Sequence, residues 1–460
     1  MELRERNTGT IVDYEVEEDN NTFVRFFVCP GGMMDYVLKN VRPIISVDAA
    51  HMKSIWKGTI YMAVVKTAMD EILPVALSIQ RDNECYEGWQ YFLQKLHTSC
   101  PTLYAPHPYN RCRNWKLFTF ISDRLKGLEP ALQNVFPENH ATSCAVHIKR
   151  NVAQNFGSRA ADQVTRIAKA YTELQEEKLF KEVQAQSVDA EMYLRAIKSD
   201  TWRSTSWWAD KTLPPRFGMT TSNISESTNF VLEDGRNGCW LDCLILFMDK
   251  TIKKIATLRK KHENVLTGLN PEILQVLEKR WEGCTDYVIT QVQNDANNFL
   301  IQRADNTLLE RNQVQQIWTQ QQMCTCGRWQ EYAIPCIDAM AYFRFHCKIS
   351  FTEVLQKHVA KYHTYMAEHE ILRYNVNPVI LDQLIKDETT LPPRDTKVNA
   401  TGRPKTKRYR VRNMVPTSDR KPIQCGICHE VGHNTRTCAV RSKPGRTAID
   451  RNNTSNRDIT

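Results

Sequence analysis

The sequence predicts an α/β fold in which a largely helical insertion interrupts a mixed β-sheet. Three runs rich in β-branched residues, at 43–50, 59–68 and 72–80, are separated by short, turn-rich connections and predict an antiparallel meander. Residues 86–100 then carry apolar side chains at helical spacing, and residues 116–123 return as a strand. A helix that joins two strands in this way is typical of a parallel crossover, so the sheet is expected to contain both orientations.

The first forty residues form an acidic and then apolar leader, in which 23–29 has the composition of a strand. In the run 72–80, Pro74 lacks the N–H that a strand donates to its neighbour. We therefore expect this third strand at the edge of the sheet and the first strand, 43–50, inside it.

A mostly helical insertion is expected at residues 124–222, within a domain that spans 41–260. It contains a short helix near Leu128, a strand at 141–146 and a helical stretch at 147–198. One apolar face of this stretch is formed by Val164, Ile167, Ala168 and Tyr171. A Trp- and Pro-rich segment follows, and a helix restarts near Asn223.

Four further regions are expected after this domain. Residues 261–390 combine helical stretches with strand-like alternation around a cysteine cluster. Residues 391–422 form a linker rich in Pro, Lys and Arg, and 423–440 form a short Cys/His module. The tail, 441–460, has little to bury and is expected to be disordered.

Composition favours a reducing compartment, and the basic net charge fits either a polyanionic partner or a modest solubility bias. The net charge is +9, and part of this excess lies in the basic linker. The 15 cysteines are odd in number and several fall in C-x-C or C-x-x-C pairs, which favours metal-bound thiolates over disulfides. No secretory segment follows Met1 and no apolar run has the length of a bilayer span, so we expect no membrane association.

Two aspartates are expected at neighbouring strand ends. Asp48 ends the first central strand and Asp123 ends the strand that should run beside it. Paired carboxylates repel unless a cation lies between them, so this pair predicts a site for Mg²⁺ or Mn²⁺. Two-metal phosphoryl transfer needs a third carboxylate, for which Glu226 is the candidate.

Several short motifs follow one another in a specific order along the chain. These are ISVDAAHMKSIWKG at 45–58, ISD at 121–123 and TSNISESTN at 221–229, with Cys144 and His147 as a C-x-x-H pair between them. Over about residues 40–370 the chain resembles Mutator-like (MULE) DNA transposases. The resemblance implies an RNase H-like fold of the retroviral-integrase superfamily, with strand order 3-2-1-4-5 and an all-helical insertion before the catalytic Glu. It also implies that Asp48, Asp123 and Glu226 hold the catalytic metal ions.

Ordinary structural roles compete with these interpretations. An Asp at a strand end is often a cap or turn former. Asn223 and Glu226 have the spacing of a capping box, so the alternative role of Glu226 is to satisfy a backbone donor at a helix start. Cys144 and His147 fit metal or DNA binding, and packing of a buried Cys is the alternative.

The C-terminal Cys/His module predicts a zinc knuckle. Its C-x2-C-x4-H-x4-C spacing gives four ligands that can close a tetrahedral Zn²⁺ site, and knuckles commonly bind single-stranded nucleic acid. The ligands are Cys425, Cys428, His433 and Cys438.

A second Cys cluster resembles the SWIM zinc finger, C-x-C-x(n)-C-x-H. Cys324, Cys326 and Cys336 match the first three ligands, and Asp338 occupies the position of the His. Asp is an unusual ligand in structural zinc sites, and His346 and Cys347 lie nearby as substitutes. Zn²⁺ binding and a degenerate finger held by packing both fit this pattern.

The basic linker contains a Gly-Arg-Pro sequence that resembles an AT-hook, which lies in the minor groove of A·T-rich DNA. The basic residues are Arg403, Lys405, Lys407 and Arg408. A nuclear-localisation signal is the compatible alternative, and a solvated linker is the simpler one.

Together these features predict a nuclear DNA transposase that hydrolyses phosphodiesters at element ends and transfers the freed strand to target DNA. Pairing of two terminal repeats suggests a homodimer or larger assembly. A domesticated, non-catalytic transcription regulator is the alternative, and a nucleocapsid-like RNA chaperone would explain the knuckle alone. The family usually carries an N-terminal domain for recognising terminal repeats, and we expect none before Asp48.

Overall fold

A computed structural model describes residues 7, 9–54, 57–99, 118–123, 127–209, 213–225, 228, 232–262, 265, 267–293, 295–304, 314–370 and 428. The chain divides into two units, Met1–Val398 and Asn399–Thr460. In the second unit Cys428 alone is described. The account below therefore concerns the first unit.

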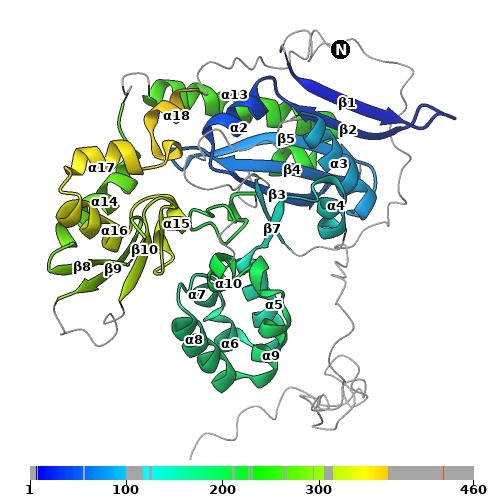
Figure 1. Ribbon diagram of the computed structural model, residues 1–460. Coiled ribbons are helices and arrows are strands. Elements are labelled where there is room, and N and C mark those ends of the chain that lie inside the picture. The colour runs from blue at the N-terminus through cyan, green and yellow to red at the C-terminus, as the bar shows by residue number, and fades with distance from the viewer. Residues whose placement is uncertain are drawn as a thin grey trace, which may run out of the picture. The chain divides into compact units, whose positions relative to one another are not determined.

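A seven-stranded mixed sheet forms the centre of this unit, with strand order β1-β2-β5-β4-β3-β6-β7 (Figure 1). The strands are β1 (Ile11–Val16), β2 (Phe23–Cys29), β3 (Ile44–His51), β4 (Thr59–Lys66), β5 (Ile72–Gln80), β6 (Thr119–Ser122) and β7 (His140–Ser143). The pairs β3–β6 and β6–β7 are parallel, and the other pairs are antiparallel. The predicted mixed α/β fold is therefore confirmed.

The central strands are buried on both faces, which explains their nearly continuous apolar sequence. Every residue of β4 from Thr59 to Val65 is buried. Helices α3 (Tyr86–Ser99) and α4 (Leu128–Val135) supply part of the cover, with Trp89 packed edge-on against Tyr61. Helix α13 (Trp240–His262) adds its apolar side chains to the same core.

The leader belongs to this sheet, and the expected edge position of the third strand is wrong. Strand β2 pairs with β5, so β5 lies inside the sheet. The pairing runs only from Leu77 to Gln80, and Pro74 lies outside it. The missing N–H of Pro74 therefore costs no bond to β2. Helix α2 (Met33–Asn40) follows β2 and completes the leader.

A separate helical core follows β7. Its elements are α5 (Ala145–Phe156), α6 (Ser158–Ala161), α7 (Val164–Ala168), α8 (Glu173–Gln186), α9 (Val188–Ala196), the 3-10 helix η2 (Ser199–Thr201) and α10 (Ser204–Ala209). Val164, Ile167 and Ala168 are buried in this core, as their spacing predicts. Thr172 and Ser187 cap α8 and α9 by accepting backbone N–H groups, which explains where these helices begin.

The described residues from 232 onward form a third group of elements. A second sheet has the order β11-β10-β9-β8, and its core includes Trp329 and Phe299. The strands are β8 (Tyr287–Gln291), β9 (Asn298–Arg303), β10 (Gln315–Trp318) and β11 (Met323–Cys324). The helices are α12 (Glu233–Asn237), α13, α14 (Pro271–Gly283), α15 (Arg328–Tyr332), α16 (Ile337–Ala341), the π-helical turn η3 (Tyr342–His346), α17 (Phe351–His358), η4 (Lys361–His363) and α18 (Tyr365–His369).

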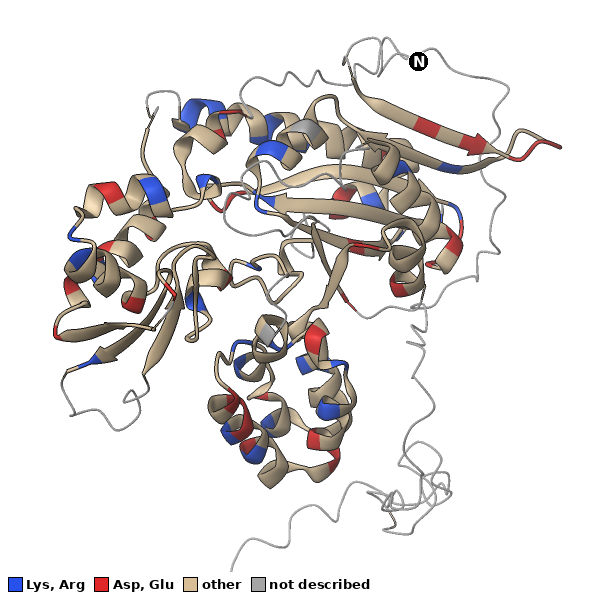
Figure 2. Ribbon diagram, viewed as in Figure 1, with Lys and Arg blue, Asp and Glu red and all other residues tan. Residues whose placement is uncertain are grey.

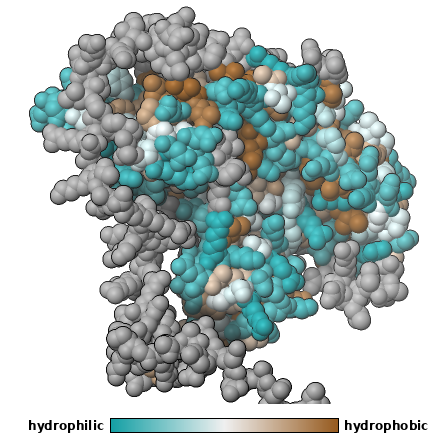
Figure 3. Space-filling view, turned by 180° about the vertical axis from the view of Figure 1, so that it is seen from behind, coloured by the Kyte–Doolittle hydropathy of each residue, from teal (hydrophilic) through white to brown (hydrophobic). Residues whose placement is uncertain are grey.

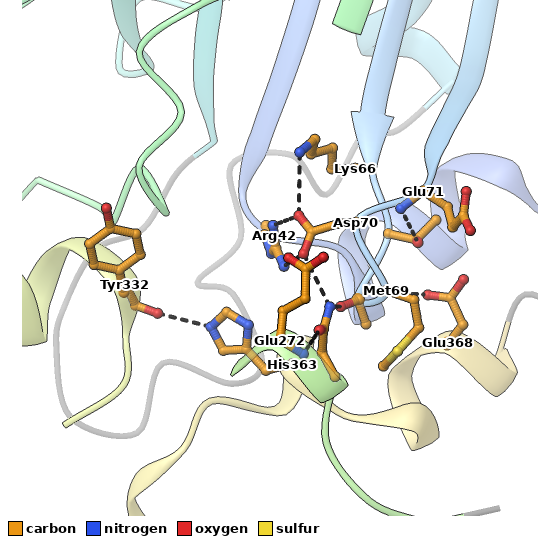
Figure 4. Close-up of polar contacts among 12 residues, drawn as sticks. Arg42, Lys66, Met69, Asp70, Glu71, Glu272, Tyr332, His363 and Glu368 are labelled. Carbon is orange, nitrogen blue, oxygen red and sulfur yellow. Dashed lines mark hydrogen bonds and ion pairs between the residues drawn. The ribbon is translucent and has the colours of Figure 1, made fainter. Parts of the chain in front are cut away.

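A polar network joins the β4–β5 hairpin to this third group (Figure 4). Arg42, whose side chain is buried, donates two hydrogen bonds to Asp70, of 2.6 and 3.1 Å. Asn270 caps α14 and donates to Asp70 at 3.1 Å, while the Met69 N–H donates to Glu368. The partly buried bonds of Asn270 and Glu368 therefore connect the hairpin to the third group, and the Arg42 bonds hold Asp70 in place for them.

Surface chemistry is mixed over the described elements. Basic and acidic side chains are interspersed on the helices and strands (Figure 2). The opposite face is mostly hydrophilic, with apolar residues gathered in patches (Figure 3). Among the described residues, no helix has both the length and the apolar character needed to cross a membrane.

Candidate functional site

Asp48 lies within β3, three residues before its end, and Asp123 is the first residue after β6, the parallel strand beside it, so the expected position of Asp48 at a strand end is wrong. Ser46 of β3 is the register partner of Ile121 of β6. Asp48 and Asp123 each follow this pair by two positions in the chain, Asp48 inside β3 and Asp123 just past the end of β6. Because neighbouring strands are about 4.8 Å apart, the two residues belong to the same region of the sheet.

A basic residue lies beside this pair. The Arg236 guanidinium of α12 donates two hydrogen bonds to the carbonyl oxygen of His51, at 3.0 and 2.8 Å, just beyond Asp48 on β3. Burial lowers the pKa of Arg236, while the negative charges of Glu233 and Asp48 oppose the shift. Asp48 is only 8% exposed, so this charge interaction is poorly screened by water.

Cys144 connects the end of β6 to the segment that leads to Glu226. Its backbone N–H donates to the carbonyl oxygen of Ser122 at 2.7 Å, and its thiol accepts from the Ser222 N–H at 3.2 Å. Burial alone would raise the pKa of Cys144, but hydrogen bonds with His147 and Ser222 outweigh it and lower the pKa. Since Cys144 is fully buried, this geometry favours the packing alternative for its side chain.

The third acidic residue, Glu226, lies outside the described residues, but its neighbour Ser225 is described. The Ser225 hydroxyl forms a hydrogen bond with the hydroxyl of Ser46. Ser46 lies on the same face of β3 as Asp48, because the two are separated by two positions. The helix that was expected to restart near Asn223 includes residues 223–225 and 228, and it begins on this face of β3.

The cluster Cys324, Cys326, Cys336 and Asp338 can hold a metal ion such as zinc. One ligand atom from each residue lies within 4.8 Å of the others. The Asp338 Oδ2 atom is 3.5 Å from Cys324 Sγ and 3.6 Å from Cys336 Sγ. A sulfur at about 2.3 Å and an oxygen at about 2.0 Å from one tetrahedral Zn²⁺ are about 3.5 Å apart, so the spacing fits.

The chemistry of these donors also fits a cation. Burial raises the pKa of Asp338 to about 7, and the negative charge of Cys326 adds to this effect. Four acidic groups confined in a buried space favour a divalent cation that balances their charge. His346 and Cys347, the substitutes considered for the fourth ligand, are not part of the cluster: His346 stacks on Tyr342, and Cys347 is exposed. Asp338 is the fourth donor.

The remaining predicted site residues lie outside the described residues, apart from Cys428, which is half-buried. These are Cys425, His433 and Cys438 of the knuckle and Arg403, Lys405, Lys407 and Arg408 of the linker.

Residues 58–206 match the model of the Mutator family of transposases. The match begins just before β4, contains Asp123, Cys144 and His147, and ends within α10. No curated protein matches the chain.

The Mutator-family match supports a transposase, and with it DNA as the partner and a nuclease- or transferase-type enzyme. Asp48 and Glu226 lie outside the matched range, so their assignment depends on the geometry above. Sequence reasoning missed Arg236 and Ser46. The period-2 spacing of Ser46 from Asp48 was an available signal, whereas no local pattern marks Arg236.

Proposed function

We propose that this chain is a Mutator-like DNA transposase in which Asp48, Asp123 and Glu226 hold two divalent metal ions. The observation that carries the proposal is the parallel register of β3 and β6, whose last pair, Ser46 and Ile121, precedes Asp48 and Asp123 by two positions each. Two contacts of the segment before Glu226 support it, because they bind this segment beside Asp48 and Asp123: Ser222 binds Cys144, and Ser225 binds Ser46 of β3.

The strand arrangement supports an RNase H-like assignment. Counted from β3, the strands β5-β4-β3-β6-β7 stand in the order 3-2-1-4-5 that the resemblance implies, and β1 and β2 are additional. The helical core from α5 to α10 lies in the sequence between β7 and Glu226, where the family carries its insertion.

When bound, Mg²⁺ or Mn²⁺ activates the attacking water or 3′-hydroxyl and stabilises the leaving oxygen. The protein's own contribution is to hold three carboxylates at fixed positions. Arg236 adds positive charge next to Asp48, where it can orient a DNA phosphate. His147 and Arg150, whose ring and guanidinium nitrogens are 3.4 Å apart on α5, can do the same nearby.

The other modules have supporting roles in this proposal. A zinc ion at Cys324, Cys326, Cys336 and Asp338 would form a SWIM-like finger, and the knuckle would bind single-stranded nucleic acid. The Arg403–Arg408 segment would contact DNA or direct import into the nucleus, where the substrate is found. Joining of two element ends requires at least a dimer.

The test uses purified full-length protein, supercoiled plasmid DNA and Mn²⁺. We expect nicking by the wild type and a loss of at least about a hundredfold in Asp48→Asn and Asp123→Asn, since each removes a metal ligand. Asp19→Asn, at an exposed turn residue, is the matched control and should retain full activity.

Calorimetric titration with Mn²⁺ separates a binding defect from a folding defect. Asp48→Asn should weaken binding while the thermal unfolding temperature is unchanged or higher, because a buried negative charge is removed. Equal nicking by wild type and both variants would exclude the metal-site assignment and favour the non-catalytic regulator.

A further inference from the structure

Ligands of the metal-binding cluster flank a short helix in the sequence. This helix contacts residues 216–218, where the segment that leads to Glu226 (the catalytic segment) begins. Helix α15 (Arg328–Tyr332) lies in the sequence between Cys326 and Cys336, so the cluster holds both ends of the segment that contains it. The Gln330 side chain adds two hydrogen bonds to the backbone of Cys324, at 3.0 and 2.8 Å. The position of α15 therefore depends on the cluster.

Glu331 on this helix binds the chain at residues 216–218. Its carbonyl oxygen accepts the Phe217 N–H at 2.7 Å, and its carboxylate accepts the Gly218 N–H at 2.9 Å. The other carboxylate oxygen is 3.8 Å from the Arg216 guanidinium. Arg216 and Glu331 are 0% and 1% exposed, so water does not compete for these contacts.

The turn that Glu331 binds has an unfavourable backbone conformation. Phe217 and Gly218 have φ angles of 52° and 71°, and a non-Gly residue rarely adopts such values without support. The Phe217 ring packs against Tyr362 and His363, at centroid distances of 5.4 and 5.5 Å. A side chain on Gly218 would come within 2.9 Å of the Tyr332 ring. The turn therefore exists because α15 and η4 hold it.

From this turn the chain runs directly to the carboxylate site. The carbonyl oxygen of Thr220 accepts the Ala145 N–H at 2.8 Å, Ser222 binds Cys144, and Ser225 binds Ser46. Each contact is an anchor between Gly218 and Glu226. The turn therefore fixes one end of a segment of fewer than ten residues that these contacts attach to the sheet and to α5.

We propose that Glu331 is a positioning residue that makes the placement of residues 216–225, the segment that leads to Glu226, depend on metal binding at Cys324, Cys326, Cys336 and Asp338. The cluster ion orders α15, α15 presents Glu331, and Glu331 fixes the turn from which the catalytic segment starts. Loss of this ion would therefore weaken metal binding at a different site, the carboxylates of the sheet. The inference rests on the proposed function for its catalytic meaning, but the coupling itself can be measured without DNA.

The experiment measures amide hydrogen exchange of the full chain by mass spectrometry. In Glu331→Ala we expect peptides that cover residues 213–222 to exchange at least about tenfold faster, since a charged, buried hydrogen bond is lost. Peptides of β3 and β6 should exchange as in the wild type, and zinc content should be unchanged. Glu278→Ala, at an exposed carboxylate on α14, is the matched control.

A metal titration provides a second measurement in case Glu331→Ala fails to fold. It uses the Cys438→Ser background, in which the predicted knuckle lacks one ligand. Removal of zinc should accelerate exchange in residues 213–222, and added zinc should restore protection. The proposal is overturned if neither Glu331→Ala nor the removal of zinc changes the exchange rate of residues 213–222.

Titration with Mn²⁺ distinguishes the two hypotheses. If the wild type binds no Mn²⁺ at the carboxylates while exchange still follows zinc, the proposed function fails and the coupling stands. If Mn²⁺ binds the carboxylates equally well with and without zinc in the cluster, the proposed coupling between the two metal sites is wrong and the proposed function still holds.

Discussion

Ser46 and Ser225 are 179 residues apart in the sequence and share a side-chain hydrogen bond in the interior. Ser46 lies on a central strand and Ser225 at the start of a helix that follows the whole helical insertion. The bond therefore holds the chain that follows the helical core, α5 to α10, against the strand that carries Asp48.

The first prediction concerns this pair. Ser46→Ala and Ser225→Ala should each lower the free energy of unfolding by about 1–3 kcal/mol, because each leaves a buried hydroxyl without its partner. The double variant should lose less than the sum of the two. Urea unfolding of the three variants measures the coupling, and strictly additive losses would contradict the contact.

A second prediction concerns the metal cluster. Asp338→Ala should lower the zinc affinity of the chain at least about tenfold, because a direct ligand should matter at least as much as an outer-shell partner. Asp338→His should bind zinc at least as well as the wild type, since His is a common ligand in such sites. Competition with a chromophoric chelator measures both. Unchanged affinity in Asp338→Ala would exclude this residue as a ligand.

A third prediction follows from His363, which is buried and donates from Nε2 to the Tyr332 carbonyl oxygen at 2.9 Å (Figure 4). Burial, with a smaller contribution from Arg42, lowers the pKa of His363 from 6.5 to about 3. The unfolded chain therefore takes up a proton below pH 6.5 that the folded chain does not. The stability that depends on a neutral His363 is therefore fully present above pH 6.5, the pKa in the unfolded chain, and is lost as the pH falls toward 3.

The measurement compares the wild type with His363→Gln, which retains a donor for Tyr332. Between pH 6.5 and 5 the stability of the wild type should fall more steeply than that of the variant, by up to about 1.4 kcal/mol per pH unit. Parallel pH profiles from chemical unfolding would show that His363 is not held neutral.

A fourth prediction concerns Asn270, whose side chain caps α14 and donates to Ala68 and Asp70. Asn270→Asp retains the cap acceptor but adds a carboxylate beside Asp70 and removes both donated bonds. It should destabilise the chain at pH 7 by about 1–3 kcal/mol, and this loss should shrink as the pH falls and the carboxylates become protonated. Asn270→Ala removes the cap without the added charge, so its loss should not shrink in this way.

The sequence predicts best what depends on near neighbours. Alternation and β-branched composition locate β3, β4 and β5, and helical spacing locates α3 and α7. These patterns report which face of an element is buried, which is a local property. The C-x-C and C-x-D spacing likewise identifies the four residues that the structure brings together.

Partners distant in the sequence were not predictable in this way. Strand β2 of the leader pairs with β5, so the strand that contains Pro74 has a neighbour on both sides and does not lie at an edge. Nothing near Glu331 indicates that it binds Gly218, which lies 113 positions away. Such contacts arise from how whole elements pack, and a single sequence carries no direct record of them.

The hairpin of β1 and β2 has one further consequence, for solubility. It covers the flank of β5, a strand whose backbone donors and acceptors would otherwise be open to strands of other molecules. The flank that it exposes in turn carries Asp13 and Glu15, which pair with Lys95 and Arg25. At the opposite flank β7 is only four residues long. Among the described strands, the sheet thus ends in a charged strand on one side and a short one on the other, and both features discourage edge-to-edge pairing with other molecules.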